Sequence, residues 1–446
     1  MSDELAIRGG PKAVTADVSE QWQRPVERQK ELVGELIDEG FLSGCNQGVA
    51  KEFEDRFRDY VGCKFVLSTS HGHTALASAF FAGGIGAGDE LITPTLGYIG
   101  GYAGALHAGA TPVFCEADPQ TLNMDAADAE KRITERTRVL LPVHQHGRPA
   151  DLDALLELAD KHELVVIEDA AHAHGSTWGG VRIGNLGHIT CFSMQGCGPG
   201  GKPVTSGEGG IVATNDRELY ERALIYCHLH RPGAVDELTN PVYRKLDSEL
   251  VGWKWRAHPL AMALGLVSLE SLDERLAKFA ANREKLEEKL ADVPGLDLIR
   301  NYPKATGCEL YGGLQFLYDP EALGGLPAAA FVEACAAEGV PISGPKVDHI
   351  EHLRSLYTEG LPGLWGEGHA GPADLPLPRH QEGDFPVSED LARRVLVMPG
   401  WIEAADGAVD QVAGAIKKVA DGHEKLIEQV VVIGEARRER AGRTPF

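Results

Sequence analysis

The sequence predicts an α/β protein with a mostly parallel sheet in a large domain and a smaller α/β domain after it. Between residues 64 and 214, short apolar runs alternate with segments of helical periodicity. Such alternation is typical of a parallel sheet that helices cover on both faces. The length of 446 residues exceeds that of a usual single domain and favours two domains.

Six apolar runs in the first part of the chain have the character of buried strands. They occupy residues 65–67, 91–92, 112–114, 139–141, 165–167 and 211–213, and helix-like segments lie at residues 74–82 and 151–162. In parallel sheets of this kind, a ligand lies at the carboxyl ends of the strands. The residues that directly follow each strand are therefore the first candidates for chemistry.

The second part of the chain begins with a long amphipathic pattern at residues 259–290, which predicts one extended helix. Further helices are expected at residues 327–338 and 408–432, with a long surface loop at residues 359–384. We therefore expect one domain at residues 1–258, including the N-terminal segment, and a second at residues 259–446, linked by the long helix.

The composition excludes some classes of protein. With 43 basic and 66 acidic side chains, the formal net charge is −23, which argues against a nucleic-acid-binding protein because such a protein needs a basic face. The eight cysteines form no C-x-x-C pair and are expected to be reduced thiols. With neither a signal-peptide pattern nor an apolar run of about 18 residues, a cytoplasmic protein without a membrane span is expected.

The stretch QGCGPGGKPVTSGEGG at residues 195–210 contains one cation, Lys202, and allows two interpretations. The spacing from Gly196 to Lys202 matches G-x-x-x-x-G-K, the pattern of a phosphate-binding P-loop. A P-loop lysine is followed by Ser or Thr and opens a helix, whereas Pro203 and then a predicted strand follow Lys202. We favour the other interpretation, in which Lys202 is a buried amine placed to form a covalent bond.

Four H-x-H pairs are candidate metal ligands, because residues i and i+2 of a strand share a face. They are His71/His73, His144/His146, His172/His174 and His228/His230. No nearby Cys or Glu completes a convincing ligand set. Histidines that pack and hydrogen-bond at strand ends are therefore the expected explanation, and no metal is predicted.

The strongest local signal is VIEDAAHA at residues 166–173. Asp169 directly follows a predicted buried strand. It could cap the following helix, or it could pair with a cationic ring nitrogen at the ligand cleft. The small residues Ala170 and Ala171 leave room for a flat ring.

Several segments resemble the DegT/DnrJ/EryC1/StrS family, whose members use pyridoxal 5′-phosphate (PLP) to aminate keto sugars and ketocyclitols. The resemblance covers roughly residues 5–425 and rests on IEDAAHAHG, FSMQ, KPVTSGEGG, SHGHTAL, GDELITPTLGY, LPVHQHGRPADLDAL and VGWKWRAHPLA. GGPKAV and WRAHPLA are most similar to the inosose aminotransferases. The resemblance implies the aspartate-aminotransferase-like fold type I of PLP-dependent transferases, and a homodimer with shared active sites.

The resemblance also implies catalytic roles. Lys202 would bind PLP covalently and move the Cα proton of the substrate. Asp169 would pair with the pyridine nitrogen and so make the ring an electron sink. His172 would lie beside the ring hydroxyl, and Tyr98 would stack on the face of the ring.

Four further residues would bind the phosphate group of PLP. His73 and Thr74 match the turn at the start of a helix, where free N–H groups and the helix dipole favour an anion. Ser193 matches the phosphate-binding serine of the family. Lys254 stands where the family has an Asn that reaches the phosphate in the neighbouring subunit.

Two departures from the family pattern bear on these roles. His73 replaces the usual Thr, and nine steps separate Ser193 from Lys202, whereas the family has five. We expect residues 196–201 to bulge as a loop, because glycine adopts positive φ without strain, and Lys202 to keep its place.

Together, the residues and the resemblance predict a PLP-dependent aminotransferase. It would move an amino group from L-glutamine or L-glutamate to a keto sugar or ketocyclitol in sugar or natural-product biosynthesis, such as that of an aminoglycoside-like antibiotic. The altered lysine loop leaves open a PLP-dependent dehydratase or epimerase of the same fold. A PLP-binding regulator is disfavoured, because the sequence has no basic face.

Overall fold

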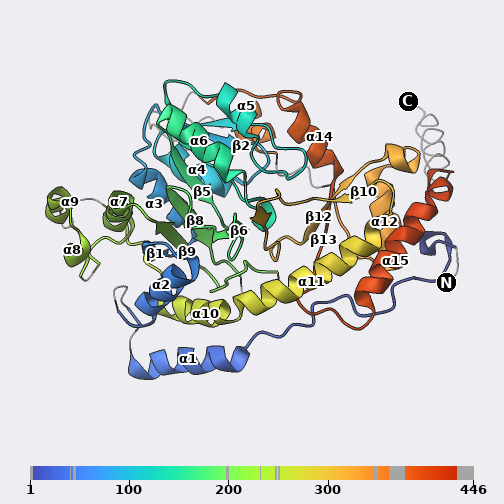
Figure 1. Ribbon diagram of the computed structural model, residues 1–446, viewed down its shortest axis with the longest axis horizontal. Coiled ribbons are helices and arrows are strands. Elements are labelled where there is room, and N and C mark those ends of the chain that lie inside the picture. The colour runs from blue at the N-terminus through green and yellow to red at the C-terminus, as the bar shows by residue number, and fades with distance from the viewer. Residues whose placement is uncertain are drawn as a thin grey trace, which may run out of the picture.

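The computed structural model describes residues 4–40, 42–43, 47–196, 200–231, 233–246, 249, 252–345, 350–360 and 377–428. Among these residues, the strands form one large sheet and two small sheets. Figure 1 shows the large sheet with helices on both faces, and the long helix α11 leading from it to one of the small sheets. The predicted α/β class is confirmed.

The large sheet has seven strands in the order β1-β9-β8-β5-β4-β2-β3. Strands β2, β3, β4, β5 and β8 run parallel, whereas β9 pairs antiparallel with both β1 and β8. The sheet is therefore mostly parallel with one reversed strand. The strands are Phe65–Thr69 (β1), Glu90–Pro94 (β2), Thr111–Cys115 (β3), Thr137–Leu140 (β4), Val165–Asp169 (β5), Ile189–Ser193 (β8) and Gly210–Thr214 (β9).

Helices bury both faces of the large sheet. Helices α3, α4 and α7 share a hydrophobic core with one face, and α2, α5, α6 and α10 pack on the other. This coverage explains why the strands read as continuous apolar runs. The helices are Gly48–Val61 (α2), Gly72–Ala82 (α3), Ile99–His107 (α4), Ala126–Lys131 (α5), Leu152–His162 (α6), Arg217–Cys227 (α7) and Pro259–Glu270 (α10).

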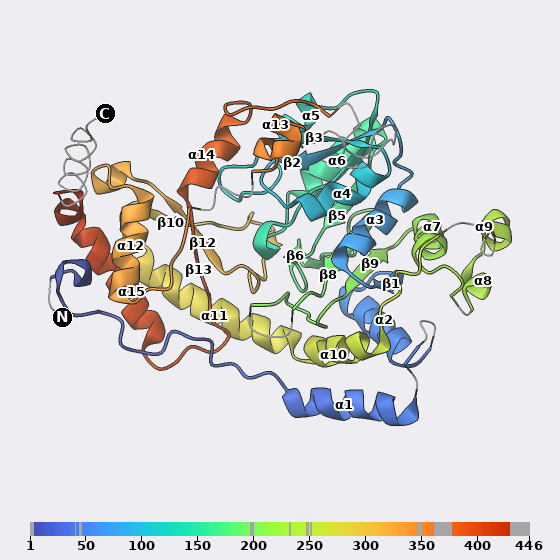
Figure 2. The same cartoon turned by 180° about the vertical axis from the view of Figure 1, so that it is seen from behind.

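A second hydrophobic core surrounds the antiparallel sheet β10-β12-β13. Leu5 and Val14 pack into this core, and the chain then runs past α11 to α1, which lies against α10 (Figures 1 and 2). The division of the chain at residue 258 stays a prediction. The elements are Val26–Glu39 (α1), Leu272–Leu290 (α11), Leu296–Leu298 (β10), Leu314–Tyr318 (β12), Ala328–Glu338 (α12), Val395–Met398 (β13) and Ala408–Asp421 (α15).

The remaining elements are short. Strands β6 (Thr177–Trp178), β7 (Val181–Arg182) and β11 (Ala305–Thr306) form the third sheet, and α8 and α9 project beyond α7 in Figure 2. The others are Ala234–Glu237 (α8), Pro241–Leu246 (α9), Ser355–Thr358 (α13), Pro386–Arg394 (α14) and the 3₁₀ turns Ala6–Arg8, Gln145–Gly147, Glu321–Leu323 and Glu351–Leu353. Every helix in the described part of the chain is too short or too polar to span a membrane.

Two predicted helices were wrong in extent. The pattern at residues 259–290 forms two helices, because Ser271 leaves helical geometry at φ −100° and ψ 4°. The pattern at residues 408–432 is interrupted after Asp421 by Gly422, and helical conformation resumes at residues 423–428. Residues 429–432, and residues 361–376 of the predicted surface loop, lie outside the described residues.

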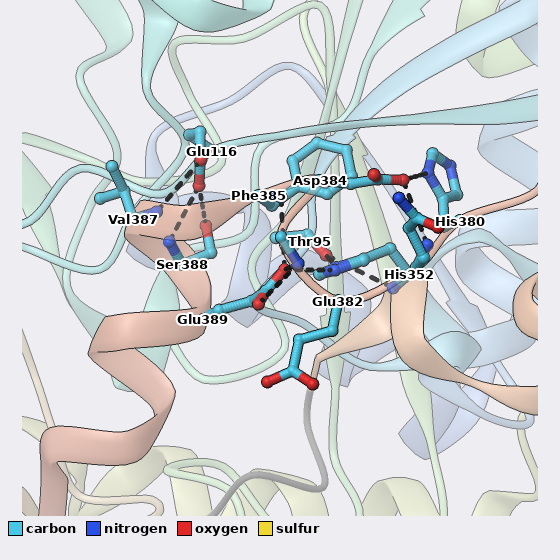
Figure 3. A network of polar contacts seen from close by, with 12 residues as sticks. Thr95, Glu116, His352, His380, Glu382, Asp384, Phe385, Val387, Ser388 and Glu389 are labelled. Atoms are coloured by element: carbon cyan, nitrogen blue, oxygen red, sulfur yellow. Dashed lines mark hydrogen bonds and ion pairs between the residues drawn. The ribbon is translucent and has the colours of Figure 1, made fainter.

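The turn that follows β2 is anchored to the C-terminal part of the chain (Figure 3). Thr95 Oγ1 lies 2.6 Å from Nδ1 of the buried His352, and His352 Nε2 lies 3.1 Å from Glu389 Oε1 of α14. The Glu351 N–H also donates to the Thr95 carbonyl at 2.8 Å. These contacts restrain the turn that carries Tyr98.

The start of α14 is capped from a distant strand. Glu116, which follows β3, accepts the Val387 N–H at 3.2 Å and the Ser388 N–H at 2.9 Å (Figure 3). A carboxylate at this place satisfies two otherwise unbonded donors and complements the helix dipole. The cap joins α14 to the edge of the large sheet.

Candidate active site

A cavity of about 1080 Å³ lies between the carboxyl ends of the large-sheet strands and the segments that flank β12 and β13. The large-sheet side is lined by polar side chains at or after strand ends, namely His73, Tyr98, Gln145, Asp169, His172, Ser193 and Lys202. Tyr311, which precedes β12, and Val397 of β13 also line the cavity. The cavity is thus where a mostly parallel sheet is expected to bind its ligand.

Asp169 ends β5 and is only 8% exposed. Its Oδ1 accepts the Ala171 N–H at 3.1 Å, and a methyl group added to Gly101 would come within 3.2 Å of Oδ2. Burial raises the pKa of Asp169, although the Ala171 N–H and the Lys202 amine act to lower it. A cation against this carboxylate would favour its charged form, which fits a protonated pyridine nitrogen.

Lys202 is also 8% exposed. Burial lowers the pKa of its amine to about 8, against the opposing effect of Asp169. At that pKa about a tenth of the amine is neutral at pH 7, whereas at an ordinary pKa of about 10.4 the neutral form is roughly 200 times rarer. The neutral amine is the form that attacks a carbonyl carbon.

Backbone hydrogen bonds hold the described residues on both sides of the insertion before Lys202. The Gly196 N–H donates to the Gly207 carbonyl at 2.9 Å, and the Lys202 N–H donates to the Gln195 carbonyl at 3.0 Å. Gly196 and Gly200 have φ of 110° and 87°, as expected for a bulged loop. Residues 197–199 lie outside the described residues. The bond between Lys202 and Gln195 keeps these two residues together, and both line the cavity despite the insertion.

Tyr311 and His172 flank the Lys202 amine. The Lys202 Nζ lies 3.6 Å from the centroid of the Tyr311 ring, and the Tyr311 and His172 rings are 4.4 Å apart. Burial and the charge of Lys202 lower the pKa of His172 well below its ordinary value. His172 Nδ1 is buried and has no hydrogen-bond partner among the described residues, which fits a partner on a bound ligand such as a ring hydroxyl.

The start of α3 meets the end of β8 at one side of the cavity. A methyl group added to Gly72 would come within 2.6 Å of Ser193 Cβ. This close approach brings the Ser193 hydroxyl beside the first backbone N–H groups of α3, where the helix dipole favours an anion. The geometry fits a phosphate group.

Thr74, Tyr98 and Lys254, which were also predicted to bind PLP, lie in three different settings. The Thr74 hydroxyl accepts the His71 N–H at 3.1 Å and donates to the His71 carbonyl at 2.8 Å, so it caps α3. Tyr98 lines the cavity and is 67% exposed. Lys254 is exposed and is not among the described residues that line the cavity. The roles expected for these side chains stay predictions.

Members of three H-x-H pairs line the cavity, namely His71, His73, His144, His146 and His172. Among the described residues, no group of three or more His, Cys, Asp or Glu side chains could hold a metal ion. His144 Nδ1 accepts the Ala150 N–H at 3.0 Å, so Nε2 carries the proton that it shares with Glu168 Oε2 at 2.9 Å. His228 Nε2 lies 2.8 Å from the Ser68 carbonyl. Both histidines therefore make structural hydrogen bonds.

Comparison with known proteins identifies the family. The profile of the DegT/DnrJ/EryC1/StrS aminotransferase family matches residues 24–340, which is more than half of the chain. The chain belongs to this family. It is a PLP-dependent aminotransferase of fold type I.

Relatives within the family act on different acceptors, as their names indicate. The L-glutamine:2-deoxy-scyllo-inosose aminotransferase of Streptomyces lividus is 38% identical over 94% of this chain and 98% of its own length. The GDP-perosamine synthase of Caulobacter vibrioides is 39% identical over 59% of this chain and 67% of its own. A solved aminotransferase from Psychrobacter cryohalolentis matches with a TM-score of 0.77 and 26% identity, over 92% of this chain and all of its own.

Reasoning from sequence missed Tyr311. This residue lies more than a hundred positions after Lys202, in the segment GCELYGG, which resembles no catalytic motif. The paired glycines Gly312 and Gly313 were the available signal, because glycine is favoured where the backbone follows a tight path. Both have positive φ in the fold.

Proposed function

We propose that this member of the DegT/DnrJ/EryC1/StrS family transfers the amino group of L-glutamine to the ketone of a cyclitol, in natural-product biosynthesis. The near full-length similarity to the Streptomyces lividus aminotransferase, whose name gives L-glutamine as donor and 2-deoxy-scyllo-inosose as acceptor, supports this substrate class. The charges that line the cavity support it independently.

The cavity lining suits a neutral polyol better than a nucleotide-linked sugar. Among the described residues that line it, there is no arginine, and Lys202 is the only lysine. Diphosphate groups are usually bound by arginine or lysine side chains. The lining instead offers amides and carboxylates that can hydrogen-bond hydroxyl groups, namely Gln145, Gln195, Glu20 and Glu208.

In this proposal the residues of the chain divide the work of the reaction. PLP supplies an aldehyde that binds the amino group and a ring that withdraws electrons. Asp169 keeps the pyridine nitrogen protonated, and His172 orients the ring through its hydroxyl. Lys202 holds the cofactor and then carries a proton at its Nζ. Ser193 and the start of α3, with His73 and Thr74, bind the phosphate.

We further propose that the protein works as a cytoplasmic homodimer. Tyr98 would stack on the ring, and Lys254 would contact the phosphate in the neighbouring subunit, since it lies outside the cavity of its own chain. The described cysteines are all buried free thiols, which suits a reducing compartment.

The large domain would span residues 1–258 and the small domain residues 259–446.

The proposal is tested with the purified protein, PLP, L-glutamine and two acceptors in parallel. One acceptor is 2-deoxy-scyllo-inosose and the other is a nucleotide-linked keto sugar, with aminated product measured by mass spectrometry. We expect product from the cyclitol, and none in the Lys202→Ala control. Product from the nucleotide-linked sugar alone would overturn the substrate class, and activity with L-glutamate but not L-glutamine would overturn the donor.

A further inference from the structure

We propose that Tyr311 is a positioning residue for the Lys202 amine, and that the face of its ring holds this amine in the protonated form. The inference rests on the proposed role of Lys202 as the lysine that carries the proton. It adds a residue from the segment before β12 to those that the family pattern assigns.

The contact between the two side chains has the geometry of a cation–π interaction. The Lys202 Nζ lies 3.6 Å from the ring centroid, well within the range of about 6 Å over which the ring attracts a cation. Because Lys202 is only 8% exposed, little water screens this attraction. Desolvated contacts of this kind are the strongest of their class.

The segment that carries Tyr311 is held in place by ion pairs of the buried Glu309. The fully buried Arg148 contacts Glu309 Oε1 at 2.9 Å, and Arg283 of α11 contacts Glu309 Oε2 at 2.7 Å. Glu309 has φ of 40°, an unusual value for a residue that is not glycine. Two arginines thus fix a strained backbone two residues before Tyr311.

A second set of contacts fixes the same segment to the residues that follow β5. The Cys308 N–H is 3.1 Å from Ser176 Oγ, and Cys308 Sγ donates to the His172 carbonyl at 2.7 Å. On the other side of Tyr311, Gly313 packs so closely that a methyl group there would come within 2.3 Å of the Met398 carbonyl. The ring is therefore presented by a segment that is fixed on both sides.

The other groups near Lys202 differ in whether they favour the charged form of its amine. Asp169 favours the charged amine, whereas burial favours the neutral amine and brings its pKa to about 8. Burial and the Lys202 charge lower the pKa of both His172 and His174, so these rings are neutral and supply no counter-charge to the ammonium. Arg275, which is also cationic, lines a small cavity together with Lys202. Besides Asp169, the Tyr311 ring contacts the Lys202 amine, with a geometry that favours the ammonium.

This arrangement matters because the amine must exist in both forms. Lys202 needs the neutral form to take a proton and the ammonium form to return it. An aromatic face stabilises the ammonium without offering a competing base, since a phenyl or phenol ring accepts no proton at neutral pH. Tyr311 would therefore set the proton affinity of Lys202 and hold the amine at the cavity wall.

The test measures the pKa of Lys202 directly, in the full chain freed of PLP. Competitive labelling with acetic anhydride at a series of pH values, followed by peptide mass spectrometry, reports the neutral fraction of this one amine. We expect Tyr311→Leu and Tyr311→Met to lower the pKa of Lys202 by about 0.4 to 1.5. Tyr311→Phe, which keeps the ring, should leave it within about 0.3 of the wild-type value.

Matched controls separate this role from a structural one. Tyr302, which packs on Trp178, is the control position, and Tyr302→Leu should leave the pKa of Lys202 unchanged. Circular dichroism checks that each variant is folded. Two non-aromatic variants at position 311 are used so that the test stands if one of them does not fold. The inference is overturned if the pKa of Lys202 is unchanged in a folded non-aromatic variant. It is also overturned if Tyr311→Phe lowers this pKa as much as the non-aromatic variants do. If another lysine bound PLP, the proposed function would fail while the pKa difference remained.

Discussion

Replacement of Gly72 by alanine inserts a methyl group into the contact between α3 and the end of β8. The new carbon would lie 2.6 Å from Ser193 Cβ, 3.0 Å from Cα and 3.1 Å from Oγ, whereas ordinary contact begins at 3.4 Å. Ser193 would have to move by roughly 0.8 Å relative to the helix to relieve this contact. Overpacking of this kind is destabilising. Alanine is otherwise the better helix former, so backbone propensity does not oppose the change.

The displacement should weaken the binding of PLP. The Ser193 hydroxyl and the first N–H groups of α3 must converge on one phosphate, and overpacking typically costs about 1–3 kcal/mol. If the cost falls on the bound state, the affinity for PLP drops about 5- to 150-fold. The dissociation constant is measured by titrating the cofactor-free chain with PLP and following its visible absorbance.

The control variant is Gly86→Ala, where an added methyl group meets no atom within 4 Å. It should bind PLP as the wild type does. Ser193→Ala, which removes the hydroxyl without crowding, should weaken binding as well. Wild-type affinity in Gly72→Ala would refute the assignment of the phosphate site to this junction.

Four further perturbations test other parts of the account. Asp169→Asn keeps the shape of the side chain but removes its charge, so turnover should fall by about 100-fold or more with little change in thermal stability; near-wild-type turnover would leave Asp169 as a cap of the Ala171 N–H. Because burial lowers the pKa of Lys202, the rate at which the cofactor-free chain captures PLP should rise with pH and level off above about 8; a rise that continues to 10.5 would contradict the buried amine. Mixed dimers of Lys202→Ala and Lys254→Ala subunits should recover activity, because one hybrid site keeps both lysines; inactive mixed dimers would rule out a shared site. Glu116→Ala should lower the free energy of unfolding by about 1–3 kcal/mol in a denaturant titration, and an unchanged value would mean that the cap on α14 contributes nothing.

Much of the large sheet could be predicted from the sequence, because buried parallel strands read as apolar runs. The six predicted runs lie in or overlap strands β1, β2, β3, β4, β5 and β9. Strand β8, ITCFS at residues 189–193, was missed, because two polar residues and a cysteine interrupt its apolar pattern. The reversal of β9 could not be predicted, since an apolar run carries no information about strand direction.

The candidate site was predictable where its residues adjoin a strand and follow a family pattern. Asp169, His172, Ser193 and Lys202 all line the cavity. Tyr311 was not predictable, because it reaches the site through contacts between segments that are distant in sequence. The closeness of Gly72 to Ser193 likewise depends on strand order and not on local sequence.

The break of the predicted helix at Ser271 illustrates a different limit. The apolar periodicity continues across residue 271, so a periodicity analysis finds one helix. In the fold, Arg275 Nη2 donates to the Ser268 carbonyl at 2.7 Å, and its Nε donates to Ser271 Oγ at 3.1 Å. Side-chain hydrogen bonds to the backbone of this kind compete with the helical pattern.

Borohydride reduction of the PLP-loaded protein, followed by peptide mapping, tests the central claim most directly. Reduction fixes PLP to the lysine that holds it, and the label is located by mass spectrometry. The account predicts one pyridoxyl group, on Lys202, despite the insertion that precedes it. A label on another lysine, or bound PLP with no labelled lysine, would contradict the assignment of Lys202 and with it the proposed aminotransferase site.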